Sequence, residues 1–246
     1  MRLSVVIPAY NEVRRIGPSL ERVWNYLCAN YGRGGFEIIV VDDGSRDRTA
    51  TLVEEFTSRG PEIRLIRLPM NRGKGAAVRA GMVAAVGDAV LFSDADLSTP
   101  IEEVEPALQL IREGSDVVIG SRALAESQIL VRQNLLRQSL GGLFNRLVRA
   151  FLGIPFRDTQ CGFKLFRREA AHAVFQRARI DGFAFDVETI LIALKLGYRV
   201  REMPVRWIND PESRVTLLRH PARMLGDLWR IRRAFSDSRL DRAMRR

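Results

Sequence analysis

Residues 89–100 read Ala-Val-Leu-Phe-Ser-Asp-Ala-Asp-Leu-Ser-Thr-Pro, and the rest of the predicted sheet can be built outward from this junction. The first four residues form a short apolar run typical of a buried strand. Thr99-Pro100-Ile101-Glu102 predicts a helix start, with proline at the first helical position and a Thr-x-x-Glu capping box. Asp94 and Asp96 are therefore expected on the turn that follows the carboxyl end of a strand.

Two carboxylates on such a turn indicate a binding site for a cation and phosphate. Ligands of open α/β sheets bind at the carboxyl ends of the strands. Asp94 and Asp96, one residue apart, suit a hard divalent cation that also holds phosphate oxygens. The alternative is that they are solvated or capping residues, because acidic side chains are common in strand-to-helix loops.

Composition sets the broad class. The chain has 246 residues, of which 46% are hydrophobic, enough for a sizeable core in one large α/β domain or two small ones. Its net charge of +10 implies an anionic partner: nucleic acid, an acidic lipid surface or a phosphorylated substrate. Cys28 and Cys161 are far apart and no secretory signal precedes them, which favours a reducing compartment.

The sequence also disfavours several classes of protein. Two histidines, His172 and His220, do not supply a His-rich zinc site, and neither lies near a candidate nucleophile of a Ser-His-Asp hydrolase. No apolar run reaches the ~18 to 20 residues of a membrane-spanning helix. We therefore expect a cytoplasmic protein, peripheral on the cytoplasmic face of the membrane if it meets one.

Strands and helices alternate in the first half of the chain. The expected strands cover residues 3–7, 36–41, 63–68, 89–92 and 116–120. One expected helix begins at 17, two cover 47–58 and 100–112, and another follows the motif at 71–75 and runs through 85. This alternation predicts a mostly parallel, doubly wound α/β sheet.

The rhythm changes after residue 122. The sequence predicts a broad amphipathic helix over 134–152, a short strand ending at 166, helices over 168–177 and 185–196, an edge strand over 198–205, and a basic helical tail from 217. The helices over 134–152 and 217–235 carry both arginines and apolar side chains, so they either dock on an anionic leaflet or pack against the sheet with a solvated face.

Four polar motifs follow four successive predicted strands: Asn11-Glu12, Asp42-Asp43, Asn71 with Lys74, and Asp94 with Asp96. In a parallel sheet these motifs converge on one edge. Glu12 and Asp42 could accept hydrogen bonds from a ribose or base, and Lys74 could meet a phosphate. The alternative for Asp42 and Asp43 is helix capping.

Two competing phosphate motifs are absent. Gly73-Lys74-Gly75-Ala76-Ala77-Val78 begins like a dinucleotide fingerprint but ends in valine, and no acidic residue follows at the required spacing. The Walker spacing is missing as well. A dehydrogenase or P-loop enzyme is therefore disfavoured.

Several stretches together resemble the family-2, inverting glycosyltransferases of the A fold. The motifs are residues 6–12, 41–45, 71–75 and 94–96. Residues 158–166 and 185–188, with Trp207 and residues 213–215, are similar more narrowly to the polyprenyl-phosphate branch, which includes dolichyl-phosphate glucose and mannose synthases. The resemblance implies one glycosyltransferase domain over 1–246, with a nucleotide-sugar half (1–122), an acceptor half (123–235) and a basic tail (236–246).

The resemblance also implies the reaction and its residues. A hexose, most simply from UDP-glucose, would pass with inversion to a dolichyl or undecaprenyl phosphate, using Mg²⁺ or Mn²⁺. The donor would be lined by Pro8, Tyr10, Glu12, Asp42, Lys74 and Asp94, and the metal held by Asp94 and Asp96. The acceptor phosphate would be gathered by Arg122, Arg137, Ser213 and Arg214. The catalytic set would be Asp96, Asp158, Arg122 and Arg137.

Some alternatives remain open on sequence grounds. Ser98 stands where mannose synthases of this branch often carry a glutamine near the metal, so either the metal shell differs or the donor is UDP-glucose. GDP-mannose as donor, and a soluble glycan or small sugar phosphate as acceptor, stay as alternatives. Asp158 has a second interpretation, a turn cap beside Arg157 or Lys164. A catalytically dead relative and a basic nucleic-acid-binding module are the other classes. We expect no nucleic-acid partner, because the arginines lie in helices of the second half and aromatic residues make up only 8%.

Overall fold

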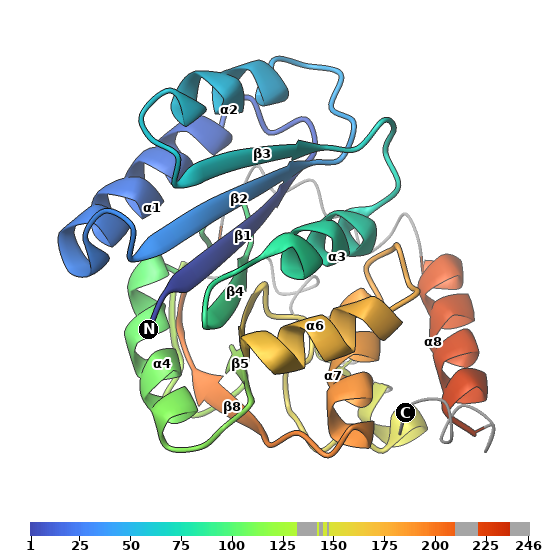
Figure 1. Cartoon of the computed structure of the whole chain (residues 1–246). Helices are drawn as coiled ribbons and strands as arrows, with labels where there is room; N and C mark the ends of the chain where they lie inside the picture. Colours follow the sequence, from blue (N-terminus) through green and yellow to red (C-terminus); the bar gives the residue numbers. More distant parts are fainter. Residues whose placement is uncertain (132–141, 143–144, 147, 210–220, 237–246) are drawn as a thin grey trace.

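The computed structural model describes residues 1–131, 142, 145–146, 148–209 and 221–236 (Figure 1). The first half of the chain alternates strands and helices: β1 (Leu3–Ala9), α1 (Ile16–Tyr31), β2 (Phe36–Asp42), α2 (Thr49–Thr57), β3 (Ile63–Arg67), α3 (Lys74–Ala84), β4 (Ala89–Ser93), the 3₁₀ helix η1 (Ile101–Glu103), α4 (Val104–Arg112) and β5 (Val117–Ser121). The second half adds β6 (Gln128–Val131), β7 (Phe163–Arg167), α6 (Arg168–Arg177), α7 (Phe185–Lys195), β8 (Val200–Pro204), β9 (Arg206–Ile208) and α8 (Pro221–Ser236). The predicted elements of the first half are all present.

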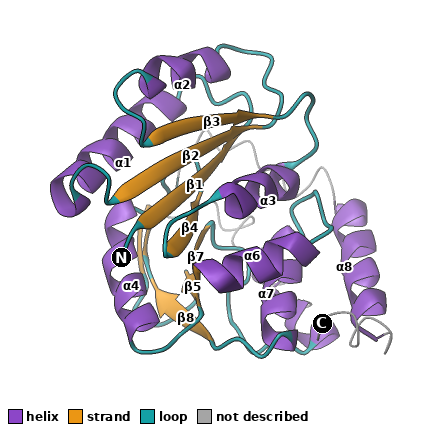
Figure 2. Ribbon diagram, in the orientation of Figure 1, coloured by secondary structure: helices purple, strands orange, loops and turns teal. Residues whose placement is uncertain are grey.

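The described strands form a seven-stranded sheet in the order β3-β2-β1-β4-β7-β5-β8, flanked by helices (Figure 2). β1 is parallel to β2 and β4, and β5 is parallel to β8. The prediction of a mostly parallel α/β sheet is confirmed, and the strand predicted over 198–205 is the edge strand β8. β7 runs antiparallel between β4 and β5, an orientation that a short buried apolar run cannot reveal, because its side-chain pattern is the same in both directions.

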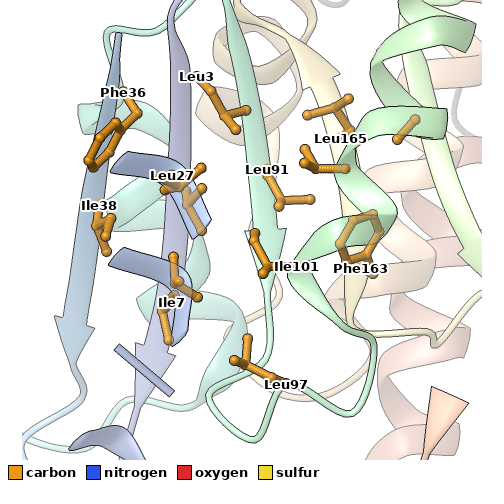
Figure 3. Packing of buried hydrophobic residues seen from close by; sticks show 14 of the residues in the cluster. Leu3, Ile7, Leu27, Phe36, Ile38, Leu91, Leu97, Ile101, Phe163 and Leu165 are labelled. Atoms are coloured by element: carbon orange, nitrogen blue, oxygen red, sulfur yellow. The ribbon is translucent and has the colours of Figure 1, made fainter. Parts of the chain in front are cut away.

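Helices cover both faces of the sheet. On one face, side chains of β1, β2 and β4 pack against α1, α2 and α4, and Leu3, Ile7, Leu27, Leu91 and Phe163 are among the buried members (Figure 3). On the other face, α3, α6, α7 and α8 bury a second cluster. The inner strands β1, β2, β4 and β5 are covered on both sides, so their residues are apolar almost without alternation, whereas the edge strands β3 and β8 keep exposed polar residues.

The predicted helix start at Pro100 is wrong in detail. Residues 101–103 form the 3₁₀ turn η1, whose N-terminus carries no side-chain cap, and the α-helix begins only at Val104. The Thr99 hydroxyl lies 3.6 Å from Cys161 Sγ instead of capping the helix. The capping box therefore does not form, because the Thr99 side chain contacts Cys161 in the loop before β7 and not the start of the helix.

A second, smaller sheet was not foreseen. β6 and β9 pair in parallel, and the chain around them crosses to the turn that follows β4. The Ile208 N–H donates to the Ser98 carbonyl at 2.8 Å. The second half of the chain thereby reaches the Asp94–Ser98 turn.

The helix predicted over 134–152 lies largely outside the described residues, and those of its residues that are described are helical. The predicted basic helix of the tail is described as α8, and residues 237–246 lie outside the description. Across the described part of the chain, every helix is too short or too polar to cross a bilayer.

Candidate active site

The polar motifs that follow β1, β2, β3 and β4 meet at the carboxyl edge of the sheet. β1 lies between β2 and β4, so the chain order reverses there and leaves the crevice in which ligands of open α/β sheets bind. Lys74 Nζ lies 2.7 Å from Asp94 Oδ1, and Arg15 Nη1 lies 3.9 Å from Asp96 Oδ2. Side chains from three separate loops are thus within reach of one small ligand.

Asp94 is held by a close approach of the chain before β7. Its N–H donates to the Gly162 carbonyl at 3.1 Å. A Cβ at position 162 would lie 1.9 Å from Asp94 Oδ2, so only glycine leaves room for the carboxylate. The Asp94 side chain stays 27% exposed and presents its carboxylate to the crevice.

Asp96 sits on the same turn with its carboxylate also at the crevice. Its Oδ1 accepts the Ser98 N–H at 2.9 Å, and Leu97 between them adopts a positive φ of 48°. Burial, together with the neighbouring charge of Asp94, raises the pKa of the Asp96 carboxyl. The two negative charges repel each other, and a cation bound between the carboxylates would offset this repulsion.

These residues fit the Mg²⁺ or Mn²⁺ that the family resemblance implies. Asp94 and Asp96 offer hard oxygen donors on one turn, and within the described residues no three His, Cys, Asp or Glu side chains gather as a complete metal cage. Such a donor set suits a cation bound by one or two carboxylates together with substrate phosphates.

Lys74 contacts aromatic rings as well as Asp94. Its Nζ lies 5.3 Å from the centre of the Phe92 ring and 6.0 Å from that of Phe185. Burial lowers the pKa of Lys74, but the charges of Asp94 and Asp186 more than offset this and the pKa is raised. The ammonium therefore stays charged.

The glycines beside Lys74 serve chain packing. The N–H groups of Gly75 and Ala76, at the start of α3, donate to the Asp181 carbonyl at 2.8 and 3.3 Å. A Cβ on Gly73 would lie 2.4 Å from that same oxygen. The start of α3 is thus covered by protein, consistent with the absence of a dinucleotide fingerprint.

The other predicted donor residues line the same edge. Asp42 is buried at the end of β2, and its carboxylate accepts the Ser45 N–H. Glu12 forms a two-point ion pair with Arg15. Pro8 lies within β1, and Tyr10, directly after β1, is 38% exposed.

Asp43 does not cap the following helix α2: the N–H of its first residue, Thr49, donates to Asp47 Oδ1 at 2.9 Å. The Asp43 carboxylate accepts the Asn71 side-chain amide and the N–H groups of Arg72 and Gly73, each at 2.8 Å. Capping by Asp43 is therefore corrected: the side chain clamps the loop that carries Lys74.

Asp158 and Arg122 form a second cluster. Asp158 Oδ2 accepts Arg122 Nε at 2.7 Å, and Oδ1 accepts Nη2 at 3.0 Å. Burial raises the pKa of the Asp158 carboxyl, but Arg122 outweighs it and brings the pKa down to about 2. Asp158 also caps its own turn, because its Oδ1 accepts the Gln160 N–H at 3.1 Å. The turn-cap alternative therefore holds together with the ion pair, and the charged partner of Asp158 is Arg122.

The Arg122 guanidinium also lies 5.6 Å from the centre of the Trp207 ring, which is buried beneath it. Its side chain remains 29% exposed, so it can still meet a ligand. The other predicted acceptor residues, Arg137, Ser213 and Arg214, lie outside the described residues.

Sequence reasoning missed a buried ion pair between Lys164 of β7 and Asp186 of α7. The Lys164 side chain is only 1% exposed and also donates to the Cys161 carbonyl at 2.7 Å. A lysine inside the apolar run Phe163-Lys164-Leu165-Phe166 was the available signal, because buried lysines require a partner. Cys161 itself is fully buried, and burial raises the pKa of its thiol to about 11, which does not suit a nucleophile.

Comparison with known proteins gives a consistent result. Residues 4–175 match the family model described as glycosyl transferase family 2. A dolichyl-phosphate beta-glucosyltransferase of Trichomonas vaginalis is 39% identical over 222 residues, or 87% of this chain and 66% of its own length. The enzyme of the same name from Dictyostelium discoideum is 36% identical over 240 residues, or 94% of this chain and 73% of its own length.

Among solved structures, glucosyl-3-phosphoglycerate synthase from Mycobacterium tuberculosis, in complex with Mn²⁺, UDP-glucose and phosphoglyceric acid, superposes with a TM-score of 0.68 at 20% identity. The match covers 94% of this chain and 79% of that one. At this identity the likeness concerns the fold, and it confirms the predicted A-type α/β architecture.

Proposed function

The chain belongs to glycosyl transferase family 2, and from this premise we propose that it transfers glucose from UDP-glucose to a polyprenyl phosphate, with inversion at the anomeric carbon. The observation that carries the proposal is the meeting of Asp94, Asp96 and Lys74 at the carboxyl edge of the sheet. The names of the relatives, dolichyl-phosphate beta-glucosyltransferases at 36 to 39% identity, support glucose and a lipid phosphate as the two substrates.

The donor half of the site supplies contacts for a nucleotide diphosphate. Asp42 and Glu12 accept hydrogen bonds from the nucleoside, with Pro8 and Tyr10 beside it. Lys74 turns its ammonium to a phosphate oxygen. Mg²⁺ or Mn²⁺ held by Asp94 and Asp96 would offset the charge that develops on the leaving nucleoside diphosphate.

The acceptor half needs cations and no strong base. A phosphate acceptor is already an anion, so the protein has to hold it in line with the anomeric carbon. Arg122 binds this phosphate, and Asp158 holds the Arg122 guanidinium in place through two hydrogen bonds. Arg137, Ser213 and Arg214 complete the phosphate site in this proposal. The division into a nucleotide-sugar half over 1–122 and an acceptor half over 123–235 belongs to the same proposal.

A lipid acceptor also requires access to a membrane surface. Trp229 of α8 is 57% exposed, and Arg233 lies 5.5 Å from its ring centre. Arg232 of the same helix lies 4.4 Å from the ring centre of Phe151. Arginines beside exposed aromatic rings suit an anionic lipid interface, which supports peripheral attachment through α8 and the residues around Phe151.

The direct test is a product assay. The purified chain is incubated with UDP-glucose, Mn²⁺ and a short polyprenyl phosphate, and the glycolipid is detected by mass spectrometry. We expect glucosyl polyprenyl phosphate with Mn²⁺ and none with EDTA. Product from GDP-mannose alone would replace glucose by mannose in the proposal, and product from a soluble sugar phosphate alone would overturn the lipid acceptor.

A binding measurement separates the donor from the acceptor. UDP, GDP, UDP-glucose, UDP-GlcNAc and GDP-mannose are each added with Mn²⁺ or EDTA while the melting temperature is recorded, since a ligand that binds the folded state raises it. We expect Mn²⁺-dependent stabilisation by the uridine nucleotides. No stabilisation by any nucleotide would indicate a relative that has lost catalysis.

A further inference from the structure

The buried ion pair Lys164–Asp186 lies directly behind the outer pair Lys74–Asp94. Lys164 is the cross-strand partner of Phe92 in the β4–β7 ladder. Its Nζ lies 5.8 Å from the centre of the Phe92 ring, and Lys74 Nζ lies 5.3 Å from the same centre. The two lysines therefore share one aromatic ring, with the inner pair buried and the outer pair facing the crevice.

Asp186 is tied to the same ring through its chain neighbour. Phe185 packs edge-on against Phe92, with ring centres 5.6 Å apart, and the ring of Phe185 also lies 6.0 Å from Lys74 Nζ. The negative charge of Asp186 acts on Lys74 as well as on Lys164. A displacement of the first turn of α7 would thus change both the packing and the charge around Lys74.

Lys164 acts on Asp94 through the backbone. Its ammonium binds the Cys161 carbonyl at 2.7 Å, which holds the peptide leading into Gly162. The Gly162 carbonyl accepts the Asp94 N–H, and the Gly162 Cα lies against the Asp94 carboxylate. The surface on which Asp94 rests is therefore held by the buried ammonium.

Stability alone is a weak reason for such a pair. Burying two charges costs desolvation that their attraction often fails to return, and well-packed apolar replacements of buried pairs can be neutral or stabilising. The pair lies behind the two charged groups that face the crevice, so a role in placing those groups explains it better than stability does.

We propose that Lys164 and Asp186 are positioning residues, which hold Asp94 and Lys74 in the arrangement that binds the diphosphate end of the donor. The inference rests on the proposed function for the identity of the ligand. The claim that the two residues keep the Asp94–Ser98 turn ordered does not depend on that function.

The test compares single and double variants. Lys164→Met leaves the buried Asp186 carboxylate without its partner and should lower the melting temperature. Lys164→Met/Asp186→Leu removes both charges and should restore most of the lost melting temperature. In the double variant the dissociation constant of UDP with Mn²⁺, measured by calorimetry, should stay weaker than in the unchanged protein by ~10- to 100-fold, the usual cost of losing groups that orient metal ligands. Amide hydrogen exchange in residues 94–98 should be faster.

Glu37→Gln is the matched control. Glu37 is likewise a buried carboxylate in an ion pair, with Arg64. It lies near the amino end of β2, whereas the site lies at the carboxyl ends of the strands. This variant should lower the melting temperature and leave both UDP affinity and exchange in 94–98 unchanged.

Unchanged UDP affinity and unchanged exchange in the double variant would overturn the positioning role. If the double variant does not fold, Asp186→Asn, which keeps the shape of the side chain and one acceptor oxygen, takes its place. The same changes in UDP affinity and in amide exchange are expected of it, without the recovery of the melting temperature. If the unchanged protein binds no UDP, the proposed function fails, and exchange in 94–98 decides the positioning role alone: faster exchange supports it and equal exchange overturns it.

Discussion

At the scale of single residues, one missing side chain sets the geometry of the donor site. Gly162 gives Asp94 its backbone acceptor and also the space that its carboxylate fills. The turn is completed by Leu97, which adopts a left-handed conformation so that the Ser98 N–H can reach Asp96. The two carboxylates are thus placed by their non-charged neighbours.

Gly162→Ala should disable the donor site without unfolding the protein. The new methyl group would meet the Asp94 carboxylate within 1.9 Å and force it out of place. We expect UDP binding with Mn²⁺ to weaken ~10-fold or more, measured by calorimetry. Gly17→Ala, in a helix with open space around the added Cβ, should leave binding unchanged. Equal UDP affinity in the two variants would contradict this account of Asp94.

Asp96→Asn tests the proposed cation site. Removing one carboxylate should reduce turnover ~100-fold or more, because the charge on the leaving diphosphate is then poorly offset. The Mn²⁺-dependent rise in melting temperature with UDP should disappear. Asp88→Asn, at the amino end of β4, removes an exposed carboxylate as a control and should keep both properties. Retained Mn²⁺ dependence in Asp96→Asn would remove Asp96 from the metal site.

At the scale of elements, buried carboxylates fasten loops of distant sequence to one another. Asp43, after β2, holds the loop that follows β3, and Asp158, before β7, holds Arg122 at the end of β5. Glu188 of α7 likewise accepts the N–H groups of Arg179 and Ile180. The same type of residue that could bind a ligand thus serves in several places to shape the site.

Asp43→Ala should release the loop that carries Lys74. Three N–H donors lose their acceptor, so we expect ~1 to 3 kcal/mol less stability, measured by urea unfolding. UDP affinity should fall as well, because Lys74 is no longer held. Thr57→Ala, which removes a surface hydroxyl bonded to a carbonyl within α2, is the control and should affect neither strongly. Full UDP affinity in Asp43→Ala would show that the loop is held by other contacts.

The Asp158–Arg122 pair predicts a pH dependence of stability. The folded pKa of about 2 lies below the usual 3.8, so the stabilisation is present above pH 4 to 5 and is lost as the pH falls toward 2. The shift corresponds to about 2 kcal/mol, of which about half is lost by pH 3. The difference in unfolding free energy between the unchanged protein and Asp158→Asn should therefore narrow between pH 6 and pH 3. A difference independent of pH would contradict the lowered pKa.

At the scale of the whole molecule, the proposed lipid acceptor requires the protein to meet a charged surface. The chain carries 39 Lys and Arg against 29 Asp and Glu, and Arg233 lies beside the exposed Trp229 ring on α8. α8 lies on the opposite side of the molecule from α4 (Figure 1). Attachment through α8 would therefore leave the α4 side in solution.

Replacing Arg230, Arg232 and Arg233 by glutamine should weaken binding to anionic vesicles. Each basic residue near the surface adds ~1 kcal/mol, an attraction that salt reduces. Flotation with phosphatidylserine vesicles measures the bound fraction. Glutamine at Arg112, Arg199 and Arg201 changes the charge equally at α4 and β8 and should leave binding intact. Equal flotation of both triple variants, or none by the unchanged protein, would contradict attachment through α8.

The order of strands and helices in the first half could be predicted from the sequence, because buried strands and amphipathic helices leave distinct local periods. The convergence of Asp94, Asp96, Lys74, Asp42 and Glu12 could be predicted too, since parallel strands end at a common edge. These conclusions depend on information spread over a few neighbouring residues. The family resemblance followed from the same short motifs.

Pairing between distant segments could not be predicted from local pattern. The antiparallel placement of β7, the clamp that Asp43 forms, the partner of Asp158 and the ion pair of Lys164 with Asp186 all join residues that are far apart in the chain. A local pattern shows that a residue is polar or buried, but not which of several possible partners it meets. The sequence by itself thus determined the residue types of the site and the order of the elements. Only the tertiary structure decided which residues pair, because pairing depends on which surfaces come together when the core forms.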